Sequence, residues 1–165
     1  MAAGLPTTVL TVADVRRAEL NALFSPHGLT LIEVPADAPI PGSYWGDEEA
    51  GLIDDRLYLR ADTPIHSVLH EGGHWLCAQA RGRRHLHTDA ASDDAEENAV
   101  CYLQILLADR ITGFGRRRAW ADMDAWGYSF RLGSAQAWFE QDADDALAWL
   151  QTHAAHLLDG TSPPT

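Results

Sequence analysis

The residues with the clearest chemical potential are two histidines and a glutamate in the stretch His70-Glu71-Gly72-Gly73-His74, an HExxH pattern. Residues four apart in a helix lie on one face, so both imidazoles can reach a single metal ion at about 2.0 to 2.1 Å. Glu71 would lie beside the metal, where it can take a proton from a water molecule whose pKa the metal lowers to about 7. The pattern predicts a zinc centre with His70 and His74 as ligands and Glu71 as catalytic base.

The two glycines inside the motif are a second signal. In the middle of a helix, each glycine costs about 0.5 to 1 kcal/mol relative to alanine. We therefore expect a neighbouring strand, helix or substrate to approach Gly72 and Gly73 closely.

A catalytic zinc site needs a third protein ligand and one open position. One source is a histidine, His85 or His87, in the polar stretch that follows the motif helix. The other source is a second helix, expected from about residue 92, whose first turns carry the acids Asp93, Asp94, Glu96 and Glu97. We expect the ligand to be one of these carboxylates, because crowded acids repel one another and a divalent cation relieves that repulsion.

The choice among the four acids depends on helical faces. Glu96 shares its face with residues that are all apolar, Ala99, Val100, Leu103 and Leu107. Glu97 shares its face with Val100, Cys101 and Gln104. The more apolar face predicts Glu96 as the third ligand, with Glu97 and Asp94 as alternatives.

The remaining pattern predicts an α+β fold. Spacing of apolar residues indicates a first helix at about 12–25, and a buried strand follows at 29–34. Short antiparallel strands are expected at 43–45, 51–53 and 56–60. Thr63 and Pro64 are expected to open the motif helix, which ends near residue 81. The second helix extends to about 111, and the C-terminal part is expected to be helical at 119–127 and 134–158. A small antiparallel sheet should therefore pack on the HExxH helix and a second ligand-bearing helix.

Composition bounds the class of protein. The chain has 165 residues, of which 24 are acidic and 12 basic, all arginine, giving a formal net charge of -12. Nucleic-acid binding is not expected, because it needs a basic face. The sequence shows neither a signal peptide nor a membrane span, so we expect a cytoplasmic protein without membrane contact. With two cysteines, Cys77 and Cys101, a disulfide scaffold is not expected.

The quoted motifs resemble those of the gluzincin-type metallopeptidases, and among the small ones the ImmA/IrrE-like group. In that group a strand hairpin precedes an HExxH helix, and a second helix carries an acidic patch followed by small and apolar residues. The matching stretches here are 51–60, 66–75 and 93–107, about 60 residues together. The resemblance implies zinc, Glu71 as the residue that activates water, and a glutamate ligand from the second helix.

The sequence thus predicts a single zincin-like domain at 1–160 with a frayed tail at 161–165. Its expected function is zinc-dependent hydrolysis of a peptide or protein substrate. The alternatives are a non-catalytic zinc domain, with His85 or His87 closing the site, and a metal-free helical interaction module. Tyr128 and His153 could stabilise an oxyanion, although core or surface roles are expected for both, and His66 is expected to be partly exposed. The sequence leaves the oligomeric state open.

Overall fold

The computed structural model describes residues 9–43, 48–82 and 94–158 of the chain. It has an α+β fold, as the sequence predicts. Its strands are β1 (Thr30–Glu33), β2 (Gly51–Ile53) and β3 (Arg56–Leu59). Its helices are η1 (Val12–Asp14), α1 (Arg17–Phe24), η2 (Ser25–His27), α2 (Ile65–Ala80), α3 (Asp94–Ala108), α4 (Gly115–Trp126), α5 (Ala135–Gln141), α6 (Asp144–His153) and α7 (Ala155–Leu158).

The three strands form one sheet in the order β1-β3-β2. β2 pairs antiparallel with β3, as expected for a hairpin, whereas β1 pairs parallel with β3. The sheet is therefore mixed. Residues 34–50 separate β1 from the hairpin along the chain. Leu52 and Leu57 face each other in the hairpin register, and both are fully buried.

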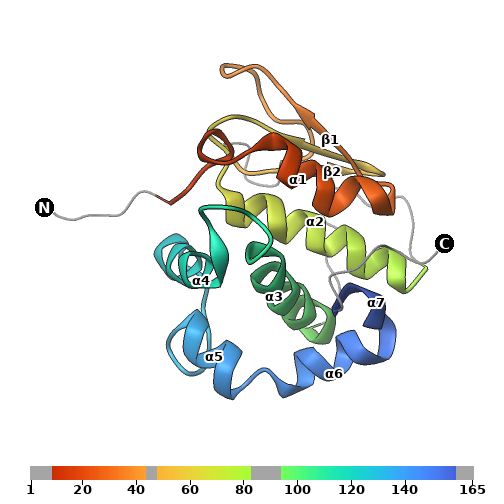
Figure 1. Ribbon diagram of the computed structural model, residues 1–165, viewed down its shortest axis with the longest axis vertical. Coiled ribbons are helices and arrows are strands. Elements are labelled where there is room, and N and C mark those ends of the chain that lie inside the picture. Colours follow the sequence, from red (N-terminus) through yellow and green to blue (C-terminus); the bar gives the residue numbers. More distant parts are fainter. Residues whose placement is uncertain (1–8, 44–47, 83–93, 159–165) are drawn as a thin grey trace, which may run out of the picture.

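Helix α2 lies between the sheet and α3, and α4 to α7 surround the far side of α3 (Figure 1). Helix α3 is buried on two sides, as its nearly continuous apolar run predicts. One side joins the core formed with α1, α2 and the sheet, through Val100, Leu103 and Leu107. The other side, with Cys101 and Ile105, packs on α4 and α5 in a second cluster. This arrangement fixes α2 and α3 against each other along the HExxH motif.

Several predicted helix boundaries differ from the structure. Helix α3 ends at Ala108 rather than near 111, and α4 begins at Gly115 rather than at 119. The expected helix at 12–25 is broken after η1, where the backbone of Val15 is extended, with φ −129° and ψ 170°. Pro64, rather than Thr63, occupies the cap position of α2, and the Thr63 hydroxyl accepts from the backbone amide of Arg60. The expected helix at 134–158 is divided into α5, α6 and α7.

Two further observations concern a membrane span and the ends of two predicted segments. No helix among the residues with described positions is long and apolar enough to cross a membrane. The predicted start of the second helix at residue 92 and the predicted frayed tail at 161–165 lie outside the described residues.

Candidate metal centre

The two histidines of the motif present their Nε2 atoms to one carboxylate. His70 and His74 lie one turn apart on α2, with ring centroids 4.7 Å apart and rings nearly perpendicular. His70 Nε2 lies 3.0 Å from Glu97 Oε1, and His74 Nε2 lies 3.0 Å from Glu97 Oε2. One carboxylate from the first turn of α3 thus bridges both imidazoles.

Glu97, and not the preferred Glu96, is the acid that the structure brings to the two histidines. Glu96 is fully buried, as its apolar face predicts, but its Oε1 lies 3.1 Å from Arg81 Nη1 at the end of α2. Successive helical residues point about 100° apart, so α3 cannot direct both acids to the same place. Asp94, the other alternative, is exposed on the first turn. The structure thus places the preferred Glu96 against Arg81, and the alternative, Glu97, against the two histidines.

The three side chains meet a geometric requirement for a metal site. One ligand atom from each of His70, His74 and Glu97 can be chosen so that all three lie within 4.8 Å of one another. Ligand atoms around one tetrahedral zinc ion lie roughly 3.3 Å apart when each bond is about 2.0 to 2.1 Å. The two 3.0 Å separations are therefore close to what zinc requires. Two imidazoles and a carboxylate also form a donor set that zinc commonly uses.

His70 is held by a side chain from the next helix. Its Nδ1 donates to Gln104 Oε1 at 2.7 Å, and Gln104 Nε2 donates to the backbone carbonyl of His66 at 3.3 Å. This bond fixes the ring orientation and leaves Nε2 directed at Glu97, as outer partners of metal-binding histidines do. Gln104 lies two helical turns after Glu97. It is the only amide in an otherwise apolar run, which was the available sequence signal for its role.

The pKa values of His70 and Glu97 are each shifted by the other residue. Burial lowers the pKa of His70, but Tyr128, Cys101 and Glu97 outweigh burial and hold it well above 6.5. Burial raises the pKa of Glu97, but hydrogen bonds from His70 and His74 outweigh it and hold this pKa far below its usual range. In the absence of a metal, the Glu97 carboxylate is ionised and a proton on His70 balances its charge.

Glu71 projects from α2 next to the two histidines. Burial raises its pKa, and this effect is opposed by His70 and His74 and reinforced by the carboxylates of Glu97 and Glu49. A carboxylate with a raised pKa binds a proton more readily at neutral pH than an exposed one. The position and the electrostatics both suit a residue that takes up and releases protons.

Tyr128, on the segment after α4, borders the site on the side of His70. Its ring centroid lies 5.7 Å from that of His70, edge to face, and its hydroxyl is 3.3 Å from His66 Nδ1. Burial raises the pKa of Tyr128 to about 12, so the phenol keeps its proton. The structure thus places Tyr128 at the site, whereas His153 is exposed on α6 and packs on Trp149.

His66 is buried, with 1% of its surface exposed, so the expectation of partial exposure is wrong. Besides Tyr128, its ring contacts Trp126 at 5.0 Å. Burial, followed by the nearby His70, lowers the pKa of His66 to about 3. A neutral imidazole therefore lies next to the Tyr128 hydroxyl.

The motif glycines have the close neighbours that the sequence predicts. A Cβ atom on Gly72 would lie 2.4 Å from Cε1 and Cζ of Phe24 in α1. A Cβ atom on Gly73 would lie 3.2 Å from Cγ1 of Val100 in α3. The glycines let α1 and α3 pack against the part of α2 that carries the site. His85 and His87, the other possible ligands, lie outside the described residues.

Comparison of the chain with models of known protein families, with curated proteins and with solved structures finds no match. The function must therefore be argued from the site itself.

Proposed function

We propose that this protein is a zinc-dependent metallopeptidase of the gluzincin type, in which His70, His74 and Glu97 hold the metal. The observation that carries the proposal is the pair of 3.0 Å contacts from the two Nε2 atoms to the two oxygens of Glu97. The HExxH pattern supplies the base, and Gln104 supplies the outer hydrogen bond to His70. Bound zinc would polarise the scissile carbonyl and lower the pKa of a water molecule to about 7.

Glu71, Tyr128 and His66 surround the ligands and have separate roles in the proposed reaction. Glu71 takes the proton of the attacking water and passes it to the leaving amine, a role that its raised pKa favours. Tyr128 keeps its hydroxyl proton and can donate it in a hydrogen bond to the oxyanion that develops on the carbonyl. For this role His66 would donate its Nδ1 proton to the Tyr128 oxygen, 3.3 Å away, which leaves the Tyr128 proton for the oxyanion.

The number of ligands distinguishes a catalytic zinc site from a structural one. Structural zinc sites use four protein ligands, and catalytic sites use three with one open position. Within the described ranges 9–43, 48–82 and 94–158, the candidate group has three members. Three ligands are the number that a catalytic site needs, whereas the alternative of a non-catalytic zinc domain requires His85 or His87 as a fourth, and both lie outside these ranges.

The test is the Glu71→Gln variant, compared with Glu140→Gln, which changes an exposed glutamate on α5. The proteins are loaded with zinc, their metal content is measured by mass spectrometry, and cleavage of a mixed peptide library is followed. We expect Glu71→Gln to keep one zinc per chain and to lower kcat by about 10²- to 10⁴-fold, the usual contribution of a general base. Glu140→Gln should behave as the wild type.

Two results would contradict the proposal. Wild-type cleavage by Glu71→Gln would remove Glu71 from the mechanism. One bound zinc without cleavage of any peptide would favour the non-catalytic zinc domain.

A further inference from the structure

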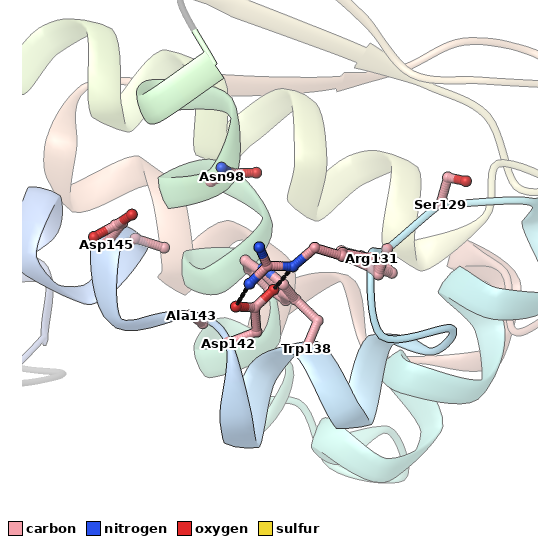
Figure 2. A pocket seen from close by; sticks show the side chains of 9 residues that line it. Asn98, Ser129, Arg131, Trp138, Asp142, Ala143 and Asp145 are labelled. Carbon is pink, nitrogen blue, oxygen red and sulfur yellow. Dashed lines mark hydrogen bonds and ion pairs between the residues drawn. The ribbon is translucent and has the colours of Figure 1, made fainter.

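A cavity of about 300 Å³ lies beside the first turns of α3, between the segment after α4 and the junction of α5 with α6. Figure 2 shows Asn98 from α3 on one side, Asp145 from α6 on another, and the Arg131–Asp142 ion pair in the middle. The complete lining is Asn98, Ser129, Phe130, Arg131, Trp138, Asp142, Ala143, Asp145 and Ala146. The volume is at the lower end of the range for ligand pockets, which suits one large side chain and not a cofactor.

The cavity is lined in part by residues that directly follow residues of the candidate metal centre. Asn98 directly follows Glu97 on α3, and Ser129 directly follows Tyr128. A row of aromatic contacts also joins the two places: the Tyr128 ring packs on His70, Phe130 stacks on Tyr128 at 6.5 Å, and Trp138 stacks on Phe130 at 5.0 Å. Phe130, which lines the cavity, is thus two ring contacts away from His70, a span that an extended peptide covers in about four residues. A peptide held at the metal centre could therefore direct the side chain of a residue a few positions from the scissile bond into the cavity.

The charged side chains that line the cavity leave one net negative charge. Arg131 binds Asp142 through two nitrogen–oxygen contacts, one of them at 3.0 Å, so these two charges neutralise each other. Asp145 is exposed and has no hydrogen-bond or ion-pair partner among the described residues. Asn98 and Ser129 add neutral polar groups, and Phe130 and Trp138 add aromatic surface. One carboxylate is thus left to bind a cation next to aromatic rings, which also attract cations.

We propose that this cavity is a substrate subsite that receives a positively charged side chain, arginine or lysine, of a peptide bound at the His70–His74–Glu97 centre. The proposal rests on the proposed peptidase function for its substrate class, and on the cavity lining for its charge preference. Asp145 is the residue that determines the preference.

The first test compares three peptides that differ at one position: arginine, its neutral isostere citrulline, or glutamate. Each candidate position on either side of the scissile bond is scanned. At the position that enters the cavity, we expect kcat/KM to favour arginine over citrulline by about tenfold or more, the effect of one charge-assisted hydrogen bond. Equal rates for arginine and citrulline at every position, or a preference for glutamate, would overturn the proposal.

Variants of the zinc-loaded protein locate the effect. Asp145→Asn should remove most of the arginine preference by lowering kcat/KM for the arginine peptide toward the value for the citrulline peptide. Asp144→Asn is the matched control, because Asp144 is an exposed acid of the same helical turn that does not line the cavity. Asp145→Lys should shift the preference toward glutamate. An unchanged preference in both Asp145 variants would overturn the assignment of that residue.

A binding measurement separates this subsite from the proposed function. N-acetyl-arginine amide is titrated into the zinc-free protein, and the indole N–H signal of Trp138 is followed by NMR after assignment with Trp138→Phe. We expect a saturable shift that N-acetyl-citrulline amide does not give and that Asp145→Asn abolishes. If this shift occurs but no peptide is cleaved, the peptidase proposal fails and the cation site stands. If peptides are cleaved but neither the shift nor the arginine preference appears, the subsite fails and the peptidase proposal stands.

Discussion

Two adjacent glutamates at the start of α3 have different partners, and this difference defines the site. Glu96 is buried against Arg81, whereas Glu97 is 43% exposed in its side chain and lies against His70 and His74. A buried carboxylate needs a cation close by, and for Glu96 that cation is part of the protein. The less buried acid is therefore the one available to a metal.

Substitution of each glutamate by glutamine separates their roles. Glu97→Gln should lower zinc affinity by at least about 100-fold, the upper range for loss of an outer-shell partner, because a direct ligand is lost. Glu96→Gln should keep zinc affinity near that of the wild type. It should reduce the free energy of unfolding by about 1 to 3 kcal/mol, because a buried charge-assisted hydrogen bond is weakened. Competition with a zinc chelator and denaturant unfolding measure the two effects, and weaker zinc binding in Glu96→Gln than in Glu97→Gln would contradict the assignment.

At the scale of single residues, the sequence predicts the site residues on α2 better than those on α3. The HExxH spacing places His70 and His74 on one face of one helix, which needs no tertiary information. The choice between Glu96 and Glu97 depends on where Arg81 lies after the chain has turned from α2 to α3, and helical periodicity does not contain that. The same holds for Tyr128, which is close to His70 only through tertiary packing.

At the scale of elements, the site depends on how closely α1 and α3 pack on α2. Gly72 contacts the Phe24 ring so closely that no side chain fits between them. In an open helix, glycine to alanine would stabilise by about 0.5 to 1 kcal/mol. Here the ring, which is fully buried, would have to move.

Gly72→Ala is therefore expected to destabilise the protein by about 1 to 3 kcal/mol, the range for overpacking of a core. For a chain of this length that lowers Tm by roughly 2 to 4 °C for each kcal/mol. Gly73→Ala is the matched comparison and should cost less, because its Cβ would meet a single methyl group of Val100 at 3.2 Å. Adding Phe24→Leu should recover part of the loss in Gly72→Ala, and a Gly72→Ala variant as stable as the wild type would contradict the close packing.

The His70–Glu97 contact also couples α2 to α3 in the metal-free protein, and this coupling depends on pH. The pKa of Glu97 is lowered on folding, so its contribution is present above its ordinary value of 4.5 and is lost as the pH falls below it. The pKa of His70 is raised on folding, so its contribution is complete below 6.5 and is lost as the pH rises through the folded value. Both contributions are complete only between these two pH values.

Below pH 6.5 the buried His66, whose pKa is lowered to about 3, stays neutral while the unfolded chain takes up a proton, which disfavours folding. We therefore expect the Tm of the zinc-free protein to rise from about pH 4.5 to 6.5 and to fall toward alkaline pH as the His70 contribution is lost. Thermal unfolding in chelator across this range measures the effect. In Glu97→Gln the alkaline decrease should be clearly smaller, because the protonated imidazoles lose their partner. An equal decrease in both proteins would show that other groups cause it.

Helices and strands are predicted well where a local apolar pattern specifies them. They are predicted less well where they depend on contacts between segments that are distant in the sequence. The hairpin of β2 and β3 follows from two short apolar runs with a turn between them. The parallel pairing of β1 with β3 joins segments separated by the loop at 34–50, and no pattern within either strand specifies its direction. The position of η1 likewise depends on hydrogen bonds to the carbonyls of Ala61 and Thr63, about fifty residues later in the chain.

At the scale of the whole molecule, the site has to be considered with a net charge of -12. Part of that charge is the Glu97 carboxylate, which faces two imidazoles that are good zinc ligands when neutral. Zinc would bring the formal charge to about -10 and would replace the proton shared by these groups. Metal binding therefore favours the folded chain by joining α2 to α3 without the need for a protonated histidine.

Zinc is accordingly expected to raise the Tm of the entire chain. A ligand that binds only the folded state at 1,000 times its Kd adds about 4 kcal/mol, which corresponds to roughly 8 to 16 °C for a protein of this size. The gain should grow from pH 6 to pH 8, because neutral imidazoles bind zinc and protonated ones do not. Magnesium, which prefers oxygen ligands, should give little gain, and Glu97→Gln should lose most of the gain with zinc. Calorimetry with metal analysis of the same samples measures both quantities. Much less than one zinc per chain, together with an unchanged Tm, would exclude the metal centre and favour a metal-free helical module.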